Sequence, residues 1–257
     1  MSKPVAIITG AARGIGQATA QRLSWDGWAL VLNGRSGPEL ESLAQATGDA
    51  EAVVADLLED QTPQRLVDTA LAKFGRVDAL VNAAGIARHG PLLAMDLQTW
   101  QSFFDLHVNA TFRCCQAAGK ALVEQGKGGS IVNLGTIAAS MAMYGTGAYA
   151  AAKGAVTSFT RVLAVELAAH QIRVNVVAPG PVATEQLRTV LEGPKYAERS
   201  RSIPLNRLAE PSEVADLIAF LVSPQSVYIT GQVFTIDGGA SAVGAYSYET
   251  YKRQAPQ

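Results

Sequence analysis

Short runs of aliphatic and β-branched residues alternate along the chain with longer segments in which apolar residues follow a helical period. The first run, VAIIT at 5–9, precedes a helical pattern over Gly14–Trp25 and a second run, ALVLN at 29–33. Unbroken apolar runs are typical of strands buried on both faces, and helices between such strands indicate parallel pairing. The pattern predicts an α/β fold, a doubly wound parallel sheet with helices on both faces.

The same alternation continues to the end of the chain, so we expect about seven strands in a single domain over residues 1–241. A charged insert with several prolines interrupts the pattern near 184–210, and a tail follows at 242–257. The remaining strands are expected at 52–55, 79–82, 130–134, 172–178 and 233–237, and the remaining helices at 38–47, 62–74, 98–125, 148–168 and 212–222.

The composition of the chain argues against nucleic acid and membranes as binding partners. The chain has 257 residues, of which 48% are hydrophobic, and can bury a sizeable core. Its formal net charge is −1 and 7% of its residues are aromatic, so neither a basic nucleic-acid footprint nor a stacking platform is present. No apolar segment is long enough to span a membrane, and the N-terminus lacks a signal-peptide pattern. We therefore expect a cytoplasmic protein that binds neither nucleic acid nor a membrane.

The two cysteines, Cys114 and Cys115, are adjacent and cannot connect distant elements. This arrangement suits a reducing compartment, in which both residues act as small buried side chains. No metal site is expected.

A glycine-rich turn, TGAARGIG, connects the first predicted strand to the first helix. Gly10 permits a tight turn, Gly14 lets the backbone approach a pyrophosphate, and Gly16 permits close packing of the helix. Free N–H groups at the start of a helix favour an anion. The turn predicts a dinucleotide site, although glycines in such a place can also serve strand-to-helix geometry alone.

The end of the second predicted strand reads NGRS. Dinucleotide folds commonly place an acidic residue there, where it accepts hydrogen bonds from the adenine ribose. Gly34 occupies that place and Arg35 follows it. Together with Arg13 in the glycine turn, Arg35 could bind a 2′-phosphate through its guanidinium fork. We therefore expect NADP (NADPH) as the cofactor, with NAD as the alternative.

A lysine stands inside an apolar helical segment, in the stretch GAYAAAKGAV at 147–156. Tyr149 and Lys153 are four residues apart, which places both side chains on one helix face. A fully buried lysine is rare unless it is paired. The pair is either a solvated edge of the helix or a functional couple, and the spacing alone does not decide between them.

Five motifs in order along the chain resemble the short-chain dehydrogenase/reductase family, in its single-domain branch: TGAARGIG, NAAG at 82–85, the asparagine of HVNAT at 107–111, YAAAK at 149–153 and PGPVAT at 179–184. The resemblance runs from about Pro4 to Gly239 and implies a Rossmann-like fold and a homotetramer. It makes Tyr149 the general acid/base and Lys153 the residue that holds the nicotinamide ribose. Asn109 matches the asparagine that supports a water chain from Lys153.

Two further expectations concern the reacting groups. The ammonium of Lys153 should favour the phenolate and lower the pKa of Tyr149. The family has a serine thirteen residues before the tyrosine, where this chain has Thr136, which keeps the hydroxyl but adds a methyl group. Ser140 is the alternative donor, although its expected role is to stabilise its loop.

The resemblance also assigns residues to the cofactor and to the substrate. Substrate contacts are expected from Thr136, Met141, Met143, Tyr144 and Tyr149, with further residues around 186–190 in a lid near 184–210. Cofactor contacts are expected from Gly10, Arg13, Gly14, Ile15, Gly16, Arg35, Asp56, Leu57, Asn82, Ala84, Gly85, Tyr149, Lys153, Pro179, Gly180, Val182 and Thr184.

These assignments predict an NADP-dependent oxidoreductase that transfers a hydride between a nicotinamide and a small ketone or secondary alcohol, in the manner of a carbonyl reductase. Two alternatives remain open at the level of sequence. One is an NAD-dependent polyol or sugar dehydrogenase, and the other is a protein that senses the cofactor without turnover.

Overall fold

The computed structural model describes residues 3–86, 90–185, 187 and 194–243. At its centre is a sheet of seven strands in the order β3-β2-β1-β4-β5-β6-β7, in which all neighbouring strands are parallel. The predicted doubly wound parallel sheet is therefore confirmed. The strands are β1 (Val5–Thr9), β2 (Ala29–Gly34), β3 (Ala50–Val54), β4 (Ala79–Asn82), β5 (Gly129–Leu134), β6 (Ile172–Pro179) and β7 (Val233–Ile236).

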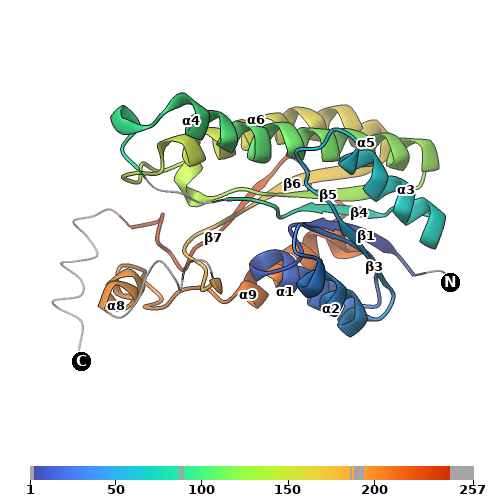
Figure 1. Ribbon diagram of the computed structural model, residues 1–257, viewed down its shortest axis with the longest axis horizontal. Coiled ribbons are helices and arrows are strands. Elements are labelled where there is room, and N and C mark those ends of the chain that lie inside the picture. The colour runs from blue at the N-terminus through green and yellow to red at the C-terminus, as the bar shows by residue number, and fades with distance from the viewer. Residues whose placement is uncertain (1–2, 87–89, 186, 188–193, 244–257) are drawn as a thin grey trace.

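Two layers of helices cover the sheet (Figure 1). One face carries α3 (Thr62–Phe74), α4 (Leu97–Phe104), α5 (Thr111–Gln125) and α6 (Gly147–Leu167). The other carries α1 (Gly14–Trp25), α2 (Gly37–Thr47) and α9 (Pro211–Val222). Short helical turns lie at η1 (Leu92–Ala94), η3 (Ile137–Ala139), η4 (Ala168–His170) and η5 (Pro224–Ser226).

The strands are apolar on both sides because each side meets a helical layer. In β1, Ile7 belongs to the core cluster under α3 and α5, whereas its neighbour Ile8 belongs to the cluster under α1 and α9. Val31 and Leu32 of β2 divide between the same two clusters. Successive side chains of a strand point to opposite faces, so a strand buried twice has no polar face.

The long helix expected over Gln98–Gln125 is wrong as a single element. The π-helical segment η2 (Asp105–Ala110) separates α4 from α5. A π turn widens the helix by one residue, and such bulges occur often at functional sites. The hydrophobic pattern does not reveal it, because apolar residues continue at near-helical spacing on both sides. The π segment carries His107 and Ala110, which are both buried.

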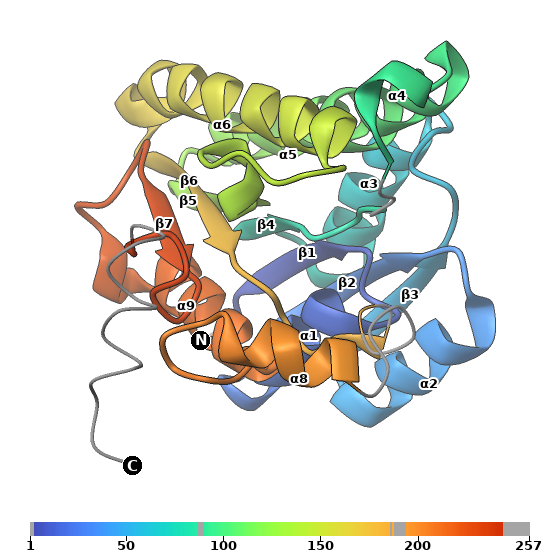
Figure 2. The same ribbon diagram turned by 90° about the vertical axis from the view of Figure 1, so that its left-hand side faces the viewer.

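The insert near 184–210 was expected to be irregular, but it contains the helix α8 (Pro194–Arg201). In Figure 2 this helix lies outside the two layers, in front of α1. Residues 186 and 188–193 of the insert and residues 244–257 of the tail lie outside the described residues. Within the described part of the chain, no helix is both long and apolar enough to cross a membrane.

Candidate active site

A cleft of about 1410 Å³ lies at the carboxyl ends of the strands. Five connections line it: Gly10 follows β1, Gly34 ends β2, Ala83 follows β4, Gly135 follows β5 and Pro179 ends β6. Open α/β sheets bind their ligands at this edge, where the connections to the two helical layers diverge. Parallel pairing thus brings together residues that are far apart in the sequence.

At two positions the glycine turn is packed too closely for a side chain. A Cβ atom on Gly16 would lie 2.3 Å from the carbonyl oxygen of Gly10, and one on Gly10 would lie 2.6 Å from the Cα of Ala84. Gly10 and Gly14 have φ angles of +65° and +59°, which side chains disfavour. The turn therefore exposes backbone to the cleft where a dinucleotide would need a close approach.

The N-terminus of α1 opens into the same cleft. Its first turn has no acidic residue, and no side chain among the described residues caps it. The first N–H groups of a helix lack intrahelical acceptors and carry the positive end of the helix dipole. The combination of bare glycines and uncapped N–H groups fits the pyrophosphate of a dinucleotide.

Arg13, which precedes α1, and Arg35, which follows β2, both line the cleft. Nη1 of Arg35 lies 3.6 Å from Oδ2 of Asp56, and 69% of the Arg35 side chain is exposed. Gly34 is buried, and a Cβ there would lie 3.3 Å from both Ala12 Cβ and Leu40 Cδ1. Ala12 and Leu40 therefore pack around Gly34, the position where an acidic residue is common, and the guanidinium of Arg35 beside it is accessible to solvent.

Lys153 is buried on α6, with 5% of its surface exposed. Its Nζ donates a hydrogen bond to the carbonyl oxygen of Leu134, at 2.6 Å, at the end of β5. Burial lowers the pKa of Lys153 to about 8. The pair is thus not a solvated edge of the helix, because the lysine lies inside the protein and lines the cleft together with Tyr149.

The expectation that Lys153 lowers the pKa of Tyr149 is wrong for this structure. Burial raises the pKa of Tyr149, and a side-chain hydrogen bond with Thr136 opposes that shift only in part. The reason is geometric, since the Lys153 ammonium donates to Leu134. The phenol is therefore neutral, as a proton donor must be.

Thr136 precedes η3 and lies beside the phenol, where the sequence predicted its hydroxyl. Ser140 donates its hydroxyl proton to the carbonyl oxygen of Ile137 at 3.1 Å, so its role in stabilising the loop is confirmed. Of the other residues predicted to touch substrate, Met143 lines the cleft. Met141 and Tyr144 are not among the described residues that line it, and 92% of Tyr144 is exposed.

Two predicted asparagines do not reach the cleft. Asn109 is exposed on η2, and its Nδ2 donates to Oδ1 of Asp105 at 3.1 Å. Asn82 is buried, and its Nδ2 donates to Oδ1 of Asn133 at 2.8 Å. Asn109 points outward because it lies off the inward stripe of the helix, and Asn82 is held in a polar network between β4 and β5. Both placements correct the sequence prediction.

His107 is the residue that the sequence prediction missed. It lines the cleft, is 1% exposed, and its ring centroid lies 5.4 Å from that of Tyr149. The signal was present in the spacing, because Phe103, His107, Ala110 and Cys114 follow one another at intervals of four, three and four residues. These four residues are buried, and Asn109 is outside this stripe.

Sixteen of the seventeen predicted cofactor residues line the cleft, Asn82 being the exception. Arg199 of α8, which the sequence did not single out, also lines it. Among the described residues no cluster of His, Cys, Asp or Glu could hold a metal ion. The sixteen residues are Gly10, Arg13, Gly14, Ile15, Gly16, Arg35, Asp56, Leu57, Ala84, Gly85, Tyr149, Lys153, Pro179, Gly180, Val182 and Thr184.

Comparison with known proteins identifies the family. A family model described as "Enoyl-(Acyl carrier protein) reductase" matches residues 10–241. A solved structure, a short-chain type dehydrogenase/reductase from Mycobacterium marinum, superposes with a TM-score of 0.89 at 32% identity, covering 94% of this chain and 97% of the other. The chain belongs to the short-chain dehydrogenase/reductase family.

The relatives of this chain within the short-chain dehydrogenase/reductase family include proteins named as reductases and proteins named as dehydrogenases. A 3-oxoacyl-(acyl-carrier-protein) reductase of Synechocystis is 40% identical over 245 residues, which are 93% of this chain and 97% of the relative. A D-threitol dehydrogenase of Mycolicibacterium smegmatis is 38% identical over 239 residues, or 91% and 92% of the two chains. This chain is accordingly a short-chain dehydrogenase/reductase, an oxidoreductase that acts on carbonyl or alcohol groups with a nicotinamide cofactor.

Proposed function

We propose that this short-chain dehydrogenase/reductase is an NADPH-dependent reductase of a small ketone, able to run in reverse on the secondary alcohol. The observation that carries the proposal is the end of β2, where buried Gly34 replaces a ribose-binding acid and exposed Arg35 follows it. A guanidinium at that place complements a 2′-phosphate, whereas an acidic residue would repel it.

The residues of the cleft fit such a cofactor. Gly10 and Gly16 let the turn pack tightly against Ala84 and against itself, and Gly14 is the glycine at which we expect the backbone to approach the pyrophosphate. The uncapped N-terminus of α1 supplies N–H donors. When bound, the cofactor supplies the hydride. By family resemblance, Tyr149 gives its phenolic proton to the substrate oxygen and Lys153 holds the nicotinamide ribose. Thr136, hydrogen-bonded to Tyr149, orients the same oxygen.

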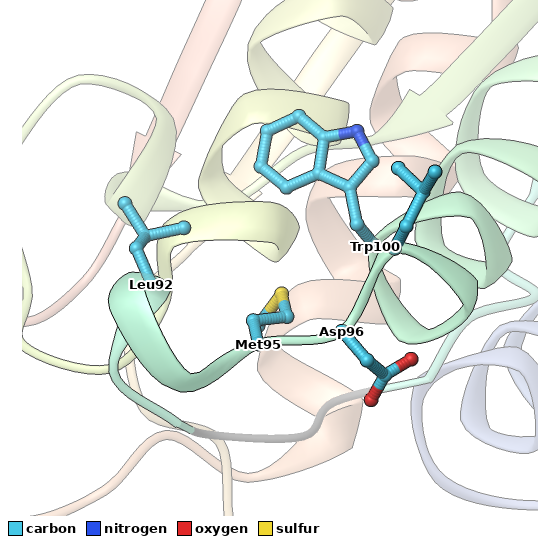
Figure 3. Close-up of a pocket in the computed structure, with 5 residues that line it drawn as sticks. Leu92, Met95, Asp96 and Trp100 are labelled. Carbon is cyan, nitrogen blue, oxygen red and sulfur yellow. The ribbon is translucent and has the colours of Figure 1, made fainter.

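The surroundings of Tyr149 favour an apolar or mixed carbonyl compound. Met95 and Trp100 pack against the cluster of Phe103, Ala148 and Ala152 that also contacts Tyr149. They border a separate pocket of about 260 Å³, which includes Leu92. In Figure 3 the side chains of Leu92, Met95 and Trp100 lie on one side of the segment, while the Asp96 carboxylate points away.

An NAD-dependent polyol or sugar dehydrogenase is the second candidate. The similarity to a D-threitol dehydrogenase, at 38% identity, favours it. The similarity to a 3-oxoacyl-(acyl-carrier-protein) reductase, at 40% identity, favours carbonyl reduction. Initial rates with a panel of ketones and NADPH or NADH, and of polyols and secondary alcohols with NADP⁺ or NAD⁺, separate the two candidates.

Arg35→Ala tests the cofactor. A charge-assisted contact to phosphate contributes about 1.5–3 kcal/mol, so the variant should bind NADPH about tenfold to a hundredfold more weakly and NADH almost unchanged. Affinities are measured by fluorescence titration at two salt concentrations, because ions screen an exposed contact. Arg65→Ala, an exposed arginine of α3 away from the cleft, is the matched control.

Equal binding of NADH and NADPH by the wild type, unchanged in Arg35→Ala, would refute NADPH preference. Replacing Gly34 by Asp is a less clean test. Its Cβ would already be 3.3 Å from Ala12 and Leu40, so reversal of the preference by Gly34→Asp with Arg35→Ala requires these neighbours to move. If the double variant bound neither NADPH nor NADH, the cause would be disturbed packing around position 34 rather than the change of charge.

We further propose a cytoplasmic homotetramer. The outer faces of α5 and α6 carry apolar side chains in contact with solvent, including Phe112, Val162 and Val165, which are 50%, 57% and 78% exposed. Faces of this kind are commonly covered by isologous packing of a second copy. Cys114 and Cys115 are free and buried, and burial raises the pKa of both thiols, which suits a reducing compartment.

A further inference from the structure

His107 has one ring nitrogen with a partner and one without. Its Nε2 lies 2.9 Å from the carbonyl oxygen of Ile86 and 3.3 Å from the backbone nitrogen of the same residue. Its Nδ1 is buried and has no hydrogen-bond partner in the described part of the chain. Buried polar atoms are nearly always satisfied, so this nitrogen is a candidate acceptor for a donor that borders the same cleft.

The protein makes room for this ring next to the reacting groups. The π-helical segment η2 carries His107, and the ring stacks on Phe103 while its edge meets Tyr149. A Cβ on Gly85 would lie 2.7 Å from Cε1 and 3.3 Å from Nδ1 of the ring. Only glycine at position 85 therefore allows the imidazole to occupy this place.

Two contacts of Nε2 bear on the tautomer of the ring: Nε2 can donate to the carbonyl oxygen of Ile86 at 2.9 Å, or accept from the N–H group of Ile86 at 3.3 Å. We assign the proton to Nε2 because the contact with the carbonyl oxygen is the shorter of the two. Nδ1 then carries a lone pair and can only accept. Burial, together with the positive charge of Lys153, lowers the pKa of His107 to about 3, so the ring is neutral at physiological pH.

Lys153 is the natural donor. Its ammonium has three N–H groups, and the structure assigns one of them to the carbonyl of Leu134. Lys153 is also the charged group, among the described residues, whose field acts on the His107 ring. An ammonium with free donors and an imidazole with a free acceptor therefore border the same cleft.

We propose that His107 is a positioning residue for the Tyr149–Lys153 pair, with its Nδ1 accepting a hydrogen bond from the Lys153 ammonium, directly or through one water molecule. No bond to His107 is made or broken during turnover. The acceptor holds the ammonium charged and oriented beside the phenol. The inference rests on the proposed roles of Tyr149 and Lys153, and it assigns to His107 the support that the sequence had assigned to Asn109.

Two amide variants separate the two ring nitrogens. The amide of asparagine is attached at Cγ, as Nδ1 is, whereas that of glutamine lies one bond further out, at the place of Nε2. His107→Asn therefore keeps an acceptor toward Lys153 and loses the Ile86 contact, and His107→Gln does the reverse. We expect His107→Asn to keep kcat within about fivefold, and His107→Gln to lose about tenfold to a hundredfold, with little change in KM or cofactor affinity.

The pH profile gives a readout that packing alone does not change. Loss of an acceptor destabilises the ammonium, so the alkaline limb of kcat for ketone reduction should move to lower pH in His107→Gln but not in His107→Asn. Within the described part of the chain, Tyr149 and Lys153, both on α6, are the titratable groups that face the ring. Equal loss in the two variants, or no loss in either, would overturn the proposal.

A measurement on the unmodified protein covers the case in which a variant fails to fold. Nitrogen-15 NMR of the wild type, with the His107 signal assigned by its absence in either variant, should show a neutral ring protonated on Nε2 between pH 6 and 9. A proton on Nδ1 would also overturn the proposal. Turnover by Tyr149→Phe would instead refute the proposed roles of the catalytic pair, and the NMR result does not depend on them.

Discussion

At the scale of single residues, the phenol of Tyr149 is the group whose removal should be most informative. Its ring packs against Phe103 and His107, while its hydroxyl pairs with Thr136. Tyr149→Phe keeps the ring and removes the proton, so we expect turnover to be abolished and nucleotide binding to be almost unchanged. Calorimetric titration with cofactor beside steady-state rates checks both halves. Activity within tenfold of wild type would exclude Tyr149 as the proton donor.

The buried imidazole of His107 should make the protein sensitive to acid. The pKa is lowered from 6.5 to about 3, so between these values the unfolded chain binds a proton that the folded chain does not. Stability should therefore fall as the pH falls from 6.5 towards 3, by up to about 1.4 kcal/mol per pH unit. Urea unfolding of wild type and His107→Asn at several pH values isolates this contribution, because the carboxyl groups titrate in both proteins. Parallel stability curves would contradict it.

At the scale of elements, the glycines of two helices have opposite roles. A Cβ on Gly16, at the start of α1, would meet the carbonyl of Gly10 at 2.3 Å, whereas one on Gly154, within α6, meets nothing within 4 Å. Gly16→Ala should lower stability by about 1–3 kcal/mol and weaken cofactor binding. Gly154→Ala should raise stability by about 0.5–1 kcal/mol. Urea unfolding and cofactor titration of this matched pair check both; a neutral Gly16→Ala would show that the turn can widen.

At the scale of the whole molecule, each of the two helical layers exposes apolar side chains. Val165 on α6 is 78% exposed, and Trp25 at the end of α1, in the opposite layer, is 91% exposed. If α5 and α6 form the contact between subunits, Val165→Glu should dissociate the tetramer into smaller species, because a charge would be buried there. Trp25→Glu is the control and should leave the mass unchanged. Light scattering that finds a tetramer in both variants would remove this face as the contact.

Features that depend on local spacing could be predicted from the sequence. Unbroken β-branched runs such as VAIIT predicted strands buried on both faces, and the glycines of TGAARGIG predicted the turn between β1 and α1. The four-residue interval between Tyr149 and Lys153 placed them on one face of α6. Such features follow from the period of a helix or strand, which nearby residues set without reference to the rest of the chain.

Which polar groups meet depends on how distant segments pack together. The helical spacing places His107 on the buried stripe, but only the packing of η2 against α6 brings its ring within 5.4 Å of the Tyr149 ring, measured between centroids. Pairing of β4 with β5 places Asn82 beside Asn133 instead of in the cleft. The Lys153 ammonium donates to Leu134, at the end of another strand, so burial rather than a nearby charge governs the pKa of Tyr149. These outcomes depend on distances between segments that are remote in sequence, and packing fixes those distances.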